Sequence, residues 1–467
     1  MGMYDLVKND DGLLDDRIQN ILALEEGIES RKVDESAKLL ARKVIKPSGI
    51  GGVDSPSVEI VVGSADCPSI SAAKAVRLVS LDVFRGITVA LMILVDDGGA
   101  FCPAINHSPW NGITIADFVM PFFLFIVGVS LGLTYKNVSN RIDATWKAVF
   151  RALKLFTMGV VLQGGFFHGV HSLTFGIDLL KIRVMGVLQR IAIAYLMAAI
   201  CEVWLTNDVL VDSGYSLVKK YQLQFLVGGV LTAIYLVLLY GLFVPDWQYQ
   251  IPIHGDRSIL YSVKCGVRGD TSPACNAVGM IDRKILGIEH LYKRPAYGRT
   301  KQCSINSPYS GPLPADAPSW CGAPFDPEGL LSTIMAIVTC LIGLHFGHVI
   351  VHFKNHKARV FQWMISSSCL LASAFFLIYF GMHINKALYT VSYTTITTAA
   401  SGLLFAGIYL LVDVCGYRRP TYSMEWMGKH ALMIYVLVAC NILPIFIHGF
   451  YWKEPKVNLL RWLGFTV

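Results

Sequence analysis

The chain has 467 residues, of which 54% are hydrophobic and only 16% are charged. Such a composition leaves too little polar surface for a soluble protein of this length, and it is typical of a polytopic membrane protein. The formal net charge of +7 is spread in small clusters near the ends of apolar segments, which argues against a nucleic-acid partner.

The start of the chain differs from the rest in composition. Residues 1–73 are largely polar and include a Gly-, Ser- and Pro-rich piece at 47–68. Such segments behave as linkers, because they bury too little apolar surface to offset the entropy of ordering. We therefore predict a cytosolic, partly disordered tail over residues 1–73 and a membrane domain over residues 74–467.

About nine apolar stretches follow, each close to the roughly 20 residues that a helix needs to cross a bilayer. They cover residues 81–101, 112–135, 149–167, 184–205, 223–244, 329–351, 360–381, 391–414 and 430–450. None alternates in polarity as a barrel strand would. The sequence predicts an all-α fold: a polytopic integral membrane helix bundle of about nine or ten transmembrane helices embedded in the lipid bilayer.

Basic residues in the short loops indicate the orientation. Lys and Arg gather at 136–151, 219–220, 354–359 and 418–429, whereas the alternate short loops hold fewer. Because cytosolic loops carry the excess of basic residues, this asymmetry predicts a cytosolic N-terminus. It also predicts that His107 and the long loop 245–328 lie on the extracytosolic side.

The long loop also contains four cysteines, Cys265, Cys275, Cys303 and Cys321. An even set of cysteines in an extracytosolic loop predicts two disulfides, consistent with an oxidising lumen or exterior. The spacing leaves the pairing open, and four free thiols are the alternative.

The link between the first two apolar stretches carries the strongest chemical signal. His107 lies in this link, and Asp117 follows near the start of the second stretch. Histidine titrates closest to neutral pH, and a carboxylate within reach would hold its tautomer. A carboxylate at membrane depth is costly, which favours a functional role. The pair is our candidate catalytic site, with a purely structural polar junction as the alternative.

Other polar residues complete the candidate site. Asp96 ends the first stretch, Trp110 offers an aromatic face for an interface or a sugar, and Asn111 offers an amide. We predict that these three bind substrate. Arg190 lies near the start of the fourth stretch and needs an anionic partner there, either a carboxylate such as Asp117 or Asp178 or the phosphate of a bound ligand.

A metal site is not expected. His345, His348 and His352 fall on one helical face with a spacing that metal ligands use. Their place at the cytosolic end of the sixth stretch favours interfacial side chains instead. The chain also has no P-loop, GxGxxG or GxSxG motif, so nothing in it supports a nucleotide hydrolase, a dinucleotide oxidoreductase or a serine hydrolase.

Several motifs follow one another along the membrane domain. They are SLDVFRG at 80–86, the block at 106–125, GVLQR at 186–190, CNAVG at 275–279, FDPEGL at 325–330, NK at 385–386 and SY at 392–393. In order and spacing, these blocks resemble the heparan-α-glucosaminide N-acetyltransferase family, whose members are polytopic transmembrane acetyltransferases. The similarity covers roughly residues 77–448.

The resemblance implies an acetyl-CoA-dependent N-acyltransferase. It would move acetyl from cytosolic acetyl-CoA, a co-substrate, to an amino sugar or related amine on the luminal side of a lysosomal or vacuolar membrane. The resemblance makes His107 the catalytic base or acetyl carrier, with Asp117 beside it and Arg190 helping to bind the coenzyme. Animal members carry an asparagine where this chain has Asp96. A carboxylate there removes an amide donor and favours a cationic acceptor.

Two other functions also fit the sequence. Intramembrane Asp, Arg and His residues also mark the substrate paths of transporters and permeases. A catalytically inactive scaffold is the other alternative: family members continue with further membrane helices, so we expect a chain ending at Val467 to leave a face of the bundle unpacked. The acceptor's identity, direct or covalent transfer, and the oligomeric state, a homo-oligomer included, stay open.

Overall fold

The computed structural model describes residues 78–98, 104–136, 138, 140–163, 182–206, 211–252 and 258–439. All of them belong to one compact unit, Ala75–Val467. The predicted tail over residues 1–73 lies outside the described residues, and so does most of the ninth apolar stretch.

The described part of the membrane domain is mostly helical, as predicted. Its first half contains α2 (Val79–Gly98), the 3-10 turn η1 (Ile115–Phe118), α3 (Val119–Thr134), α4 (Arg141–Gln163), α5 (Val187–Trp204), α6 (Gly214–Lys220) and α7 (Gln222–Gly241). Its second half contains α8 (Ala277–Ile285), α9 (Leu330–His352), α10 (His356–Tyr379), α11 (Val391–Tyr409), the π-helical turn η4 (Leu410–Val414), α12 (Tyr422–Lys429) and α13 (Ala431–Ala439).

Six of the described helical segments are long and apolar enough to cross a membrane. They are Ile115–Thr134, Val187–Trp204, Gln222–Gly241, Leu330–His352, His356–Tyr379 and Val391–Val414. Helices α2 and α4 lie at two further predicted stretches but carry charged side chains such as Asp82 and Arg151. A membrane bundle is therefore supported, whereas the predicted number of nine or ten transmembrane helices is not confirmed by the described residues.

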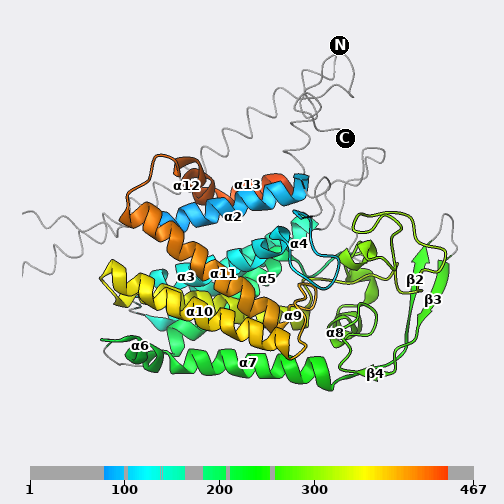
Figure 1. Cartoon of the computed structure of the whole chain (residues 1–467). Helices are drawn as coiled ribbons and strands as arrows, with labels where there is room; N and C mark the ends of the chain where they lie inside the picture. Colours follow the sequence, from blue (N-terminus) through cyan, green and yellow to red (C-terminus); the bar gives the residue numbers. More distant parts are fainter. Residues whose placement is uncertain are drawn as a thin grey trace, which may run out of the picture. The chain divides into compact units, whose positions relative to one another are not determined.

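The long helices lie side by side, and the shorter elements gather at their ends (Figure 1). Helix α8 and the strands lie at one end, which we call the loop end because it carries the loop between α7 and α9. Helices α6 and α12 lie at the opposite end. Helices α2 and α10 both run toward the loop end, so the links that follow them lie there as well.

Helices α3 and α9 pack closely in the bundle core, and glycines allow them to approach each other. A Cβ atom at Gly128 would lie 2.1 Å from the carbonyl oxygen of Cys340, and one at Gly343 would lie 2.3 Å from that of Phe125. Small residues at such contacts let membrane helices approach backbone to backbone. A larger side chain at either glycine would force α3 and α9 apart.

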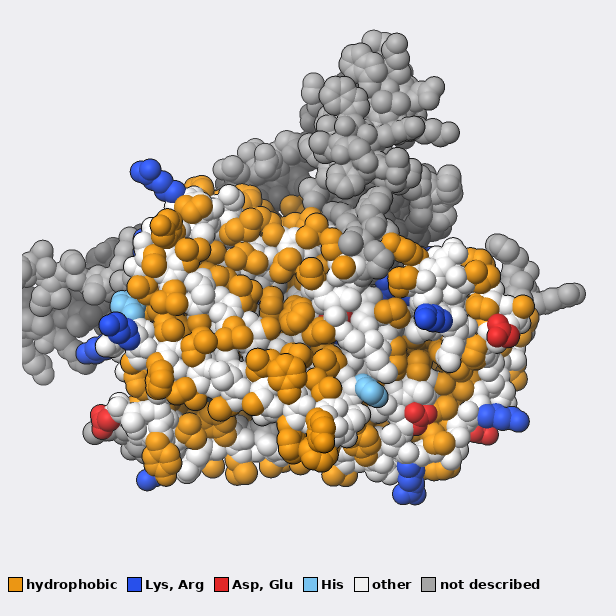
Figure 2. Space-filling model, in the orientation of Figure 1, with side chains coloured by type: hydrophobic (Ala, Val, Ile, Leu, Met, Phe, Trp, Pro, Cys, Tyr) orange, Lys and Arg blue, Asp and Glu red, His pale blue; other side chains and the backbone are white. Residues whose placement is uncertain are grey.

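Helices α7 and α10 present apolar side chains outward. On α10, exposed residues include Phe361, Phe375, Phe376 and Tyr379. Figure 2 shows hydrophobic side chains across this face of the molecule, with the charged side chains lying mainly toward its two ends. Exposed apolar surface of this extent is costly in water and suits contact with lipid.

The loop between α7 and α9 contains the strands that the all-α prediction did not anticipate. Strand β1 (Phe243–Val244) pairs with β4 (Val267–Arg268), and β2 (Trp247–Pro252) pairs with β3 (Ser258–Val263), both antiparallel. Two 3-10 turns, η2 (Ile288–His290) and η3 (Ala296–Arg299), follow α8. Strands β1 and β4 are only two residues long, whereas β2 alternates apolar and polar residues over residues 247–251, a signal that the all-α prediction did not take into account.

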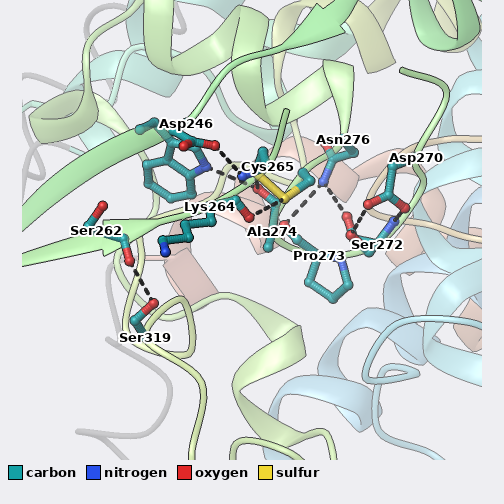
Figure 3. The surroundings of a disulfide bond; sticks show 12 residues. Asp246, Ser262, Lys264, Cys265, Asp270, Ser272, Pro273, Ala274, Asn276 and Ser319 are labelled. Carbon is teal, nitrogen blue, oxygen red and sulfur yellow. Dashed lines mark hydrogen bonds between the residues drawn. A yellow bond between two sulfur atoms is a disulfide. The ribbon is translucent and has the colours of Figure 1, made fainter. Parts of the chain in front are cut away.

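Both predicted disulfides are present in this loop. They join Cys265 to Cys275 and Cys303 to Cys321, which decides the pairing that the sequence left open. Figure 3 shows the first disulfide, with Asp246 accepting a hydrogen bond from the backbone N–H of Cys265 at 2.6 Å. The two cross-links restrict the unfolded loop and so favour the folded arrangement.

A buried polar cluster, the opposite-end cluster of Glu202, Tyr221, Gln224 and His348, joins α5, α7 and α9. His348 Nε2 lies 2.8 Å from Glu202 Oε2, and Gln224 Nε2 donates to the same oxygen at 2.8 Å. The Tyr221 ring stacks on the imidazole with centroids 3.5 Å apart. The expectation that His348 is an interfacial side chain is therefore wrong, because a carboxylate from another helix allows its burial.

Candidate functional site

The link between α2 and η1 brings His107 and Asp117 into contact. Thr114 donates to Asp117 Oδ2 at 3.0 Å from both its backbone N–H and its hydroxyl. The backbone N–H of Ser108 donates to the same oxygen at 3.2 Å. These bonds fix the buried carboxylate so that its Oδ1 lies 3.0 Å from Nδ1 of His107. The predicted pair is thus a direct hydrogen-bonded pair.

Lys386 is a third member of this site; the sequence analysis placed it in the NK motif at 385–386 but assigned it no role in the site. Its Nζ lies 2.9 Å from Nδ1 and 3.4 Å from Nε2 of His107, and 3.6 Å from Asp117 Oδ1. It comes from the link between α10 and α11. The backbone N–H of Gly112 donates to the Ile384 carbonyl at 2.9 Å and so joins the two links.

The electrostatic environment favours the neutral form of the imidazole. Burial lowers the pKa of His107, and the charge of Lys386 lowers it further, while the hydrogen bond to Asp117 acts in the opposite direction without outweighing them. Burial also lowers the pKa of Lys386, although Asp117 and Glu328 oppose this. His107 therefore keeps a free lone pair at a lower pH than an ordinary histidine does.

Asp117 and Lys386 compete for the same imidazole nitrogen. Nδ1 of His107 donates when it carries a proton and accepts when it carries a lone pair. Asp117 therefore favours the first state, and Lys386 as an ammonium favours the second. Donation to Asp117 leaves the lone pair on Nε2, which is the state that a general base or a nucleophile needs.

A first cavity, the loop cavity, lies beside this site and has a volume of about 640 Å³. Arg299, from η3, lines it and donates to the backbone carbonyl of His107 at 2.9 Å. The cations in its lining are Arg183, Lys293, Arg294, Arg299 and Lys386. Among the described residues that line it, Glu328 is the one carboxylate. The loop cavity is therefore strongly cationic.

A second cavity, the bundle cavity, has a volume of about 430 Å³ and lies among the helices. Its wall is mostly apolar, with Met92 from α2, Phe123 from α3 and Val438 from α13. Its polar lining residues are Asp96, His107, Glu328, Lys386 and Tyr435.

His107, Glu328 and Lys386 line both cavities. The imidazole is therefore within reach of ligands in two chemically different spaces, one cationic and one largely apolar. Such an arrangement can hold two reactants against one catalytic group, which lowers the entropic cost of bringing them together.

A network of charged residues fixes the turn that carries Glu328. Arg183 donates to the two carboxylate oxygens of Asp326 at 2.7 and 2.6 Å and to Glu328 Oε2 at 2.5 Å. Arg190 donates to the carbonyl of Pro327 at 2.8 Å and to the Ser332 hydroxyl. Arg183, just before α5, and Arg190, in the first turn of α5, therefore anchor the start of α9.

Arg190 is placed differently from its predicted role. It is 2% exposed, its guanidinium lies 5.2 Å from the Tyr389 ring centroid, and it is not among the described residues that line the two cavities. Its hydrogen bonds in the described part of the chain go to Pro327 and Ser332 rather than to Asp117. The other predicted partner, Asp178, lies outside the described residues.

The predicted substrate-binding residues are separated by the structure. Asp96 lines the bundle cavity, and Trp110 lines the loop cavity. The Trp110 ring is largely buried edge-on against Phe325, and its indole N–H donates to the Thr271 carbonyl at 3.0 Å. The amide oxygen of Asn111 accepts from Asn385 at 3.2 Å, so Asn111 helps to join the two links.

Sequence comparisons relate the chain to known proteins. No family model matches it. It is similar to heparan-alpha-glucosaminide N-acetyltransferase of Mus musculus, with 28% identity over 393 residues, covering 79% of this chain and 54% of the relative. The protein of that name from Homo sapiens is 27% identical over 379 residues, covering 77% of this chain and 52% of the relative. The chain spans about half the length of these curated relatives, and the resemblance that the motifs predicted is confirmed.

Proposed function

We propose that this relative of the heparan-α-glucosaminide N-acetyltransferases transfers acetyl from acetyl-CoA to an amino sugar or a related amine. The observation that carries the proposal is a hydrogen-bonded His107–Asp117 pair whose imidazole lines two cavities at once. The names of the relatives support the reaction class.

In direct transfer, His107 acts as general base. Nε2 takes a proton from the acceptor amine while the amine nitrogen attacks the thioester carbonyl. The C–S bond of the tetrahedral intermediate then breaks, and the imidazolium returns its proton to the departing thiolate. Asp117 orients the ring and stabilises the imidazolium, and Lys386, 3.4 Å from Nε2, is placed to stabilise negative charge on the carbonyl oxygen.

The same geometry also serves a covalent route. Nε2 of His107 would attack the thioester, form an acetyl-imidazole and release the coenzyme A thiolate. The acceptor amine would then attack the acetyl group, and the imidazole would leave while its Nε2 takes up the proton that the amine nitrogen loses. The two routes differ in whether labelled acetyl stays on the protein when no acceptor is present.

The two cavities suggest where the two substrates bind. The largely apolar bundle cavity suits the acetyl-pantetheine arm, with Asp96 at its polar end. The cationic loop cavity, beside Trp110, suits a sugar that carries acidic groups. Arg190 is buried and donates to the Pro327 carbonyl. We therefore assign it an indirect contribution to coenzyme binding, because it holds the position of the turn between the two cavities.

We place the loop end on the luminal side of a lysosomal or vacuolar membrane, with the N-terminus in the cytosol. Two disulfides in the loop suit an oxidising compartment. Basic residues such as Lys219, Lys220 and Lys357 flank helices at the opposite end, as expected of a cytosolic face.

The test is acetyl transfer by the purified full-length protein. Radiolabelled acetyl-CoA would be incubated with and without glucosamine, and the native chain would be compared with His107→Ala. We expect labelled N-acetylglucosamine from the native chain and none above background from the variant. The exposed His430, at the opposite end, provides a matched control, since His430→Ala should keep full activity.

Label that remains on the protein without acceptor would identify the covalent route. An intact protein that transfers acetyl to none of several amines would contradict the proposal and favour the transporter alternative. Equal activity of His107→Ala and the native chain would exclude His107 as the catalytic group.

A further inference from the structure

Glu328 has an unusual place among the charged residues of the loop end. It is 9% exposed, it precedes the N-terminal turn of α9, and it lines both cavities together with His107 and Lys386. The proposed mechanism assigns it no part. A buried carboxylate at the boundary between two ligand spaces needs a reason, because its desolvation is costly.

Pairing with Arg183 uses only one of the two oxygens of this carboxylate. Asp326 already binds Arg183 through both oxygens, and Glu328 contacts the same guanidinium through Oε2 alone. Within the described part of the chain, Oε1 of Glu328 accepts no hydrogen bond. This oxygen is also not fully enclosed by protein atoms, so a ligand can reach it. One carboxylate oxygen is therefore left for a ligand in the cavities.

The electrostatic surroundings also favour the charged form of Glu328. Burial by itself would raise the pKa of Glu328, but the charges of Arg183, Arg190 and Lys386 outweigh burial and lower it. Glu328 therefore keeps its charge to a lower pH than an ordinary glutamate does, whereas an amino sugar is an ammonium ion under acidic conditions.

We propose that Glu328 recognises the protonated amine of the acceptor and directs it to His107. The bound ammonium releases one proton to water before its nitrogen attacks, and the general-base step at Nε2 removes the second. The inference rests on the proposed function, which requires an amine to reach the imidazole through a cavity lined by five cations. Those cations repel an ammonium group everywhere except beside the single carboxylate of that lining. The same charges attract acidic groups elsewhere on the acceptor, so the cavity orients a sugar with its amine toward Glu328.

Neither of the other nearby carboxylates fits this task as well. Asp117 is fully buried, and its two oxygens already contact His107, Ser108 and Thr114. Asp96 lines the bundle cavity and not the loop cavity. Among the described residues, Glu328 is the carboxylate that lines the loop cavity, and it shares the linings of both cavities with His107.

The test compares binding of glucosamine with binding of the neutral N-acetylglucosamine, by titration calorimetry on the purified full-length protein at acidic pH. We expect the native chain to prefer glucosamine. Glu328→Gln keeps the shape and still accepts from Arg183, and it should lose roughly 10- to 100-fold in glucosamine affinity with little change for N-acetylglucosamine. In turnover, KM for glucosamine should rise by the same factor while KM for acetyl-CoA stays constant.

Asp326→Asn separates recognition from structure, because it weakens the other partner of Arg183 and leaves Glu328 in place. It should retain the preference for glucosamine. Equal weakening of both sugars by Glu328→Gln would overturn the inference and make the residue structural. Loss of the preference in Asp96→Asn, with Glu328→Gln unaffected, would also overturn it.

The binding experiment and the acetyl-transfer assay can fail independently, so their outcomes distinguish the inference from the proposed function. A native chain that prefers glucosamine through Glu328 but transfers no acetyl would remove the proposed function and keep the recognition site. A chain that transfers acetyl but shows no Glu328-dependent preference would keep the function and remove the inference.

Discussion

Two histidine–carboxylate pairs occupy the described part of this bundle, and their geometry is nearly the same. His107 lies 3.0 Å from Asp117 at the loop end, and His348 lies 2.8 Å from Glu202 in the opposite-end cluster. In both pairs the carboxylate is buried. The distance between imidazole and carboxylate therefore does not distinguish a catalytic pair from a structural one.

What differs is the surroundings of each imidazole. The His107 side chain is 37% exposed, lines two cavities and lies against the cation Lys386. The His348 side chain is 1% exposed, and the Tyr221 ring covers its face. Access and neighbouring charge, rather than the pair itself, make the first a candidate catalytic site and the second a packing element.

Removing each imidazole should separate the two pairs most strongly. We expect His107→Ala to lower acetyl transfer on the order of 10²- to 10⁴-fold, because the general base is lost. His348→Ala should keep the rate per folded molecule but lower stability by about 3 kcal/mol, since Glu202 loses a buried partner. Activity and thermal unfolding of both variants provide the measurement. Comparable losses of activity in two stable variants would contradict the distinction.

The carboxylates should differ in the same sense. Asp117→Asn keeps an oxygen for Thr114, but its amide no longer favours the tautomer with the lone pair on Nε2 of His107. We expect kcat to fall on the order of 10²-fold, within the range of acid–base contributions. Glu202→Gln is the matched change at the other pair and should leave kcat unchanged. The comparison fails if Glu202→Gln slows turnover as much as Asp117→Asn does.

The loop between α7 and α9 lies beside the His107–Asp117 pair, where its Arg299 donates to the His107 carbonyl. Loosening this loop should therefore affect the loop end more than the opposite end. Replacing Cys303 and Cys321 together by serine removes a cross-link between positions 18 apart in the chain and should destabilise the loop by about 3 kcal/mol. We expect a lower unfolding temperature and weaker acceptor binding. Cys369→Ser, at an exposed free cysteine on α10, is the control and should change neither. An unaltered unfolding temperature in the double variant would exclude a stabilising role for this disulfide.

The smallest expected effect is on pH dependence. Lys386 lowers the pKa of His107, so Lys386→Met should raise that pKa toward its usual value. His107 would then protonate at higher pH, and the acidic limb of the kcat/KM profile should move to higher pH. Lys429→Met, at the opposite end beside Glu425, should leave the limb in place. An acidic limb that stays or moves to lower pH in Lys386→Met would contradict this assignment.

Much of this arrangement was accessible from the sequence. Apolar runs located the helices, and four cysteines in one loop predicted two disulfides. The contact between His107 and Asp117 was also predictable, because they are only ten positions apart in the chain. By contrast, Lys386 lies 279 positions from His107, and Glu328 comes from a third segment, so no local pattern could place them together.

Composition and residues close in the chain were enough to predict a membrane environment, the helical class and the histidine–carboxylate pair. The tertiary structure was needed to show which cysteines pair, that the buried Arg190 donates to the Pro327 carbonyl, and that His348 is enclosed with Glu202. It also decided that His107, Lys386 and Glu328 line two cavities together. These features depend on how separate helices pack, because burial and charge at one side chain are set by neighbours that are distant in the chain.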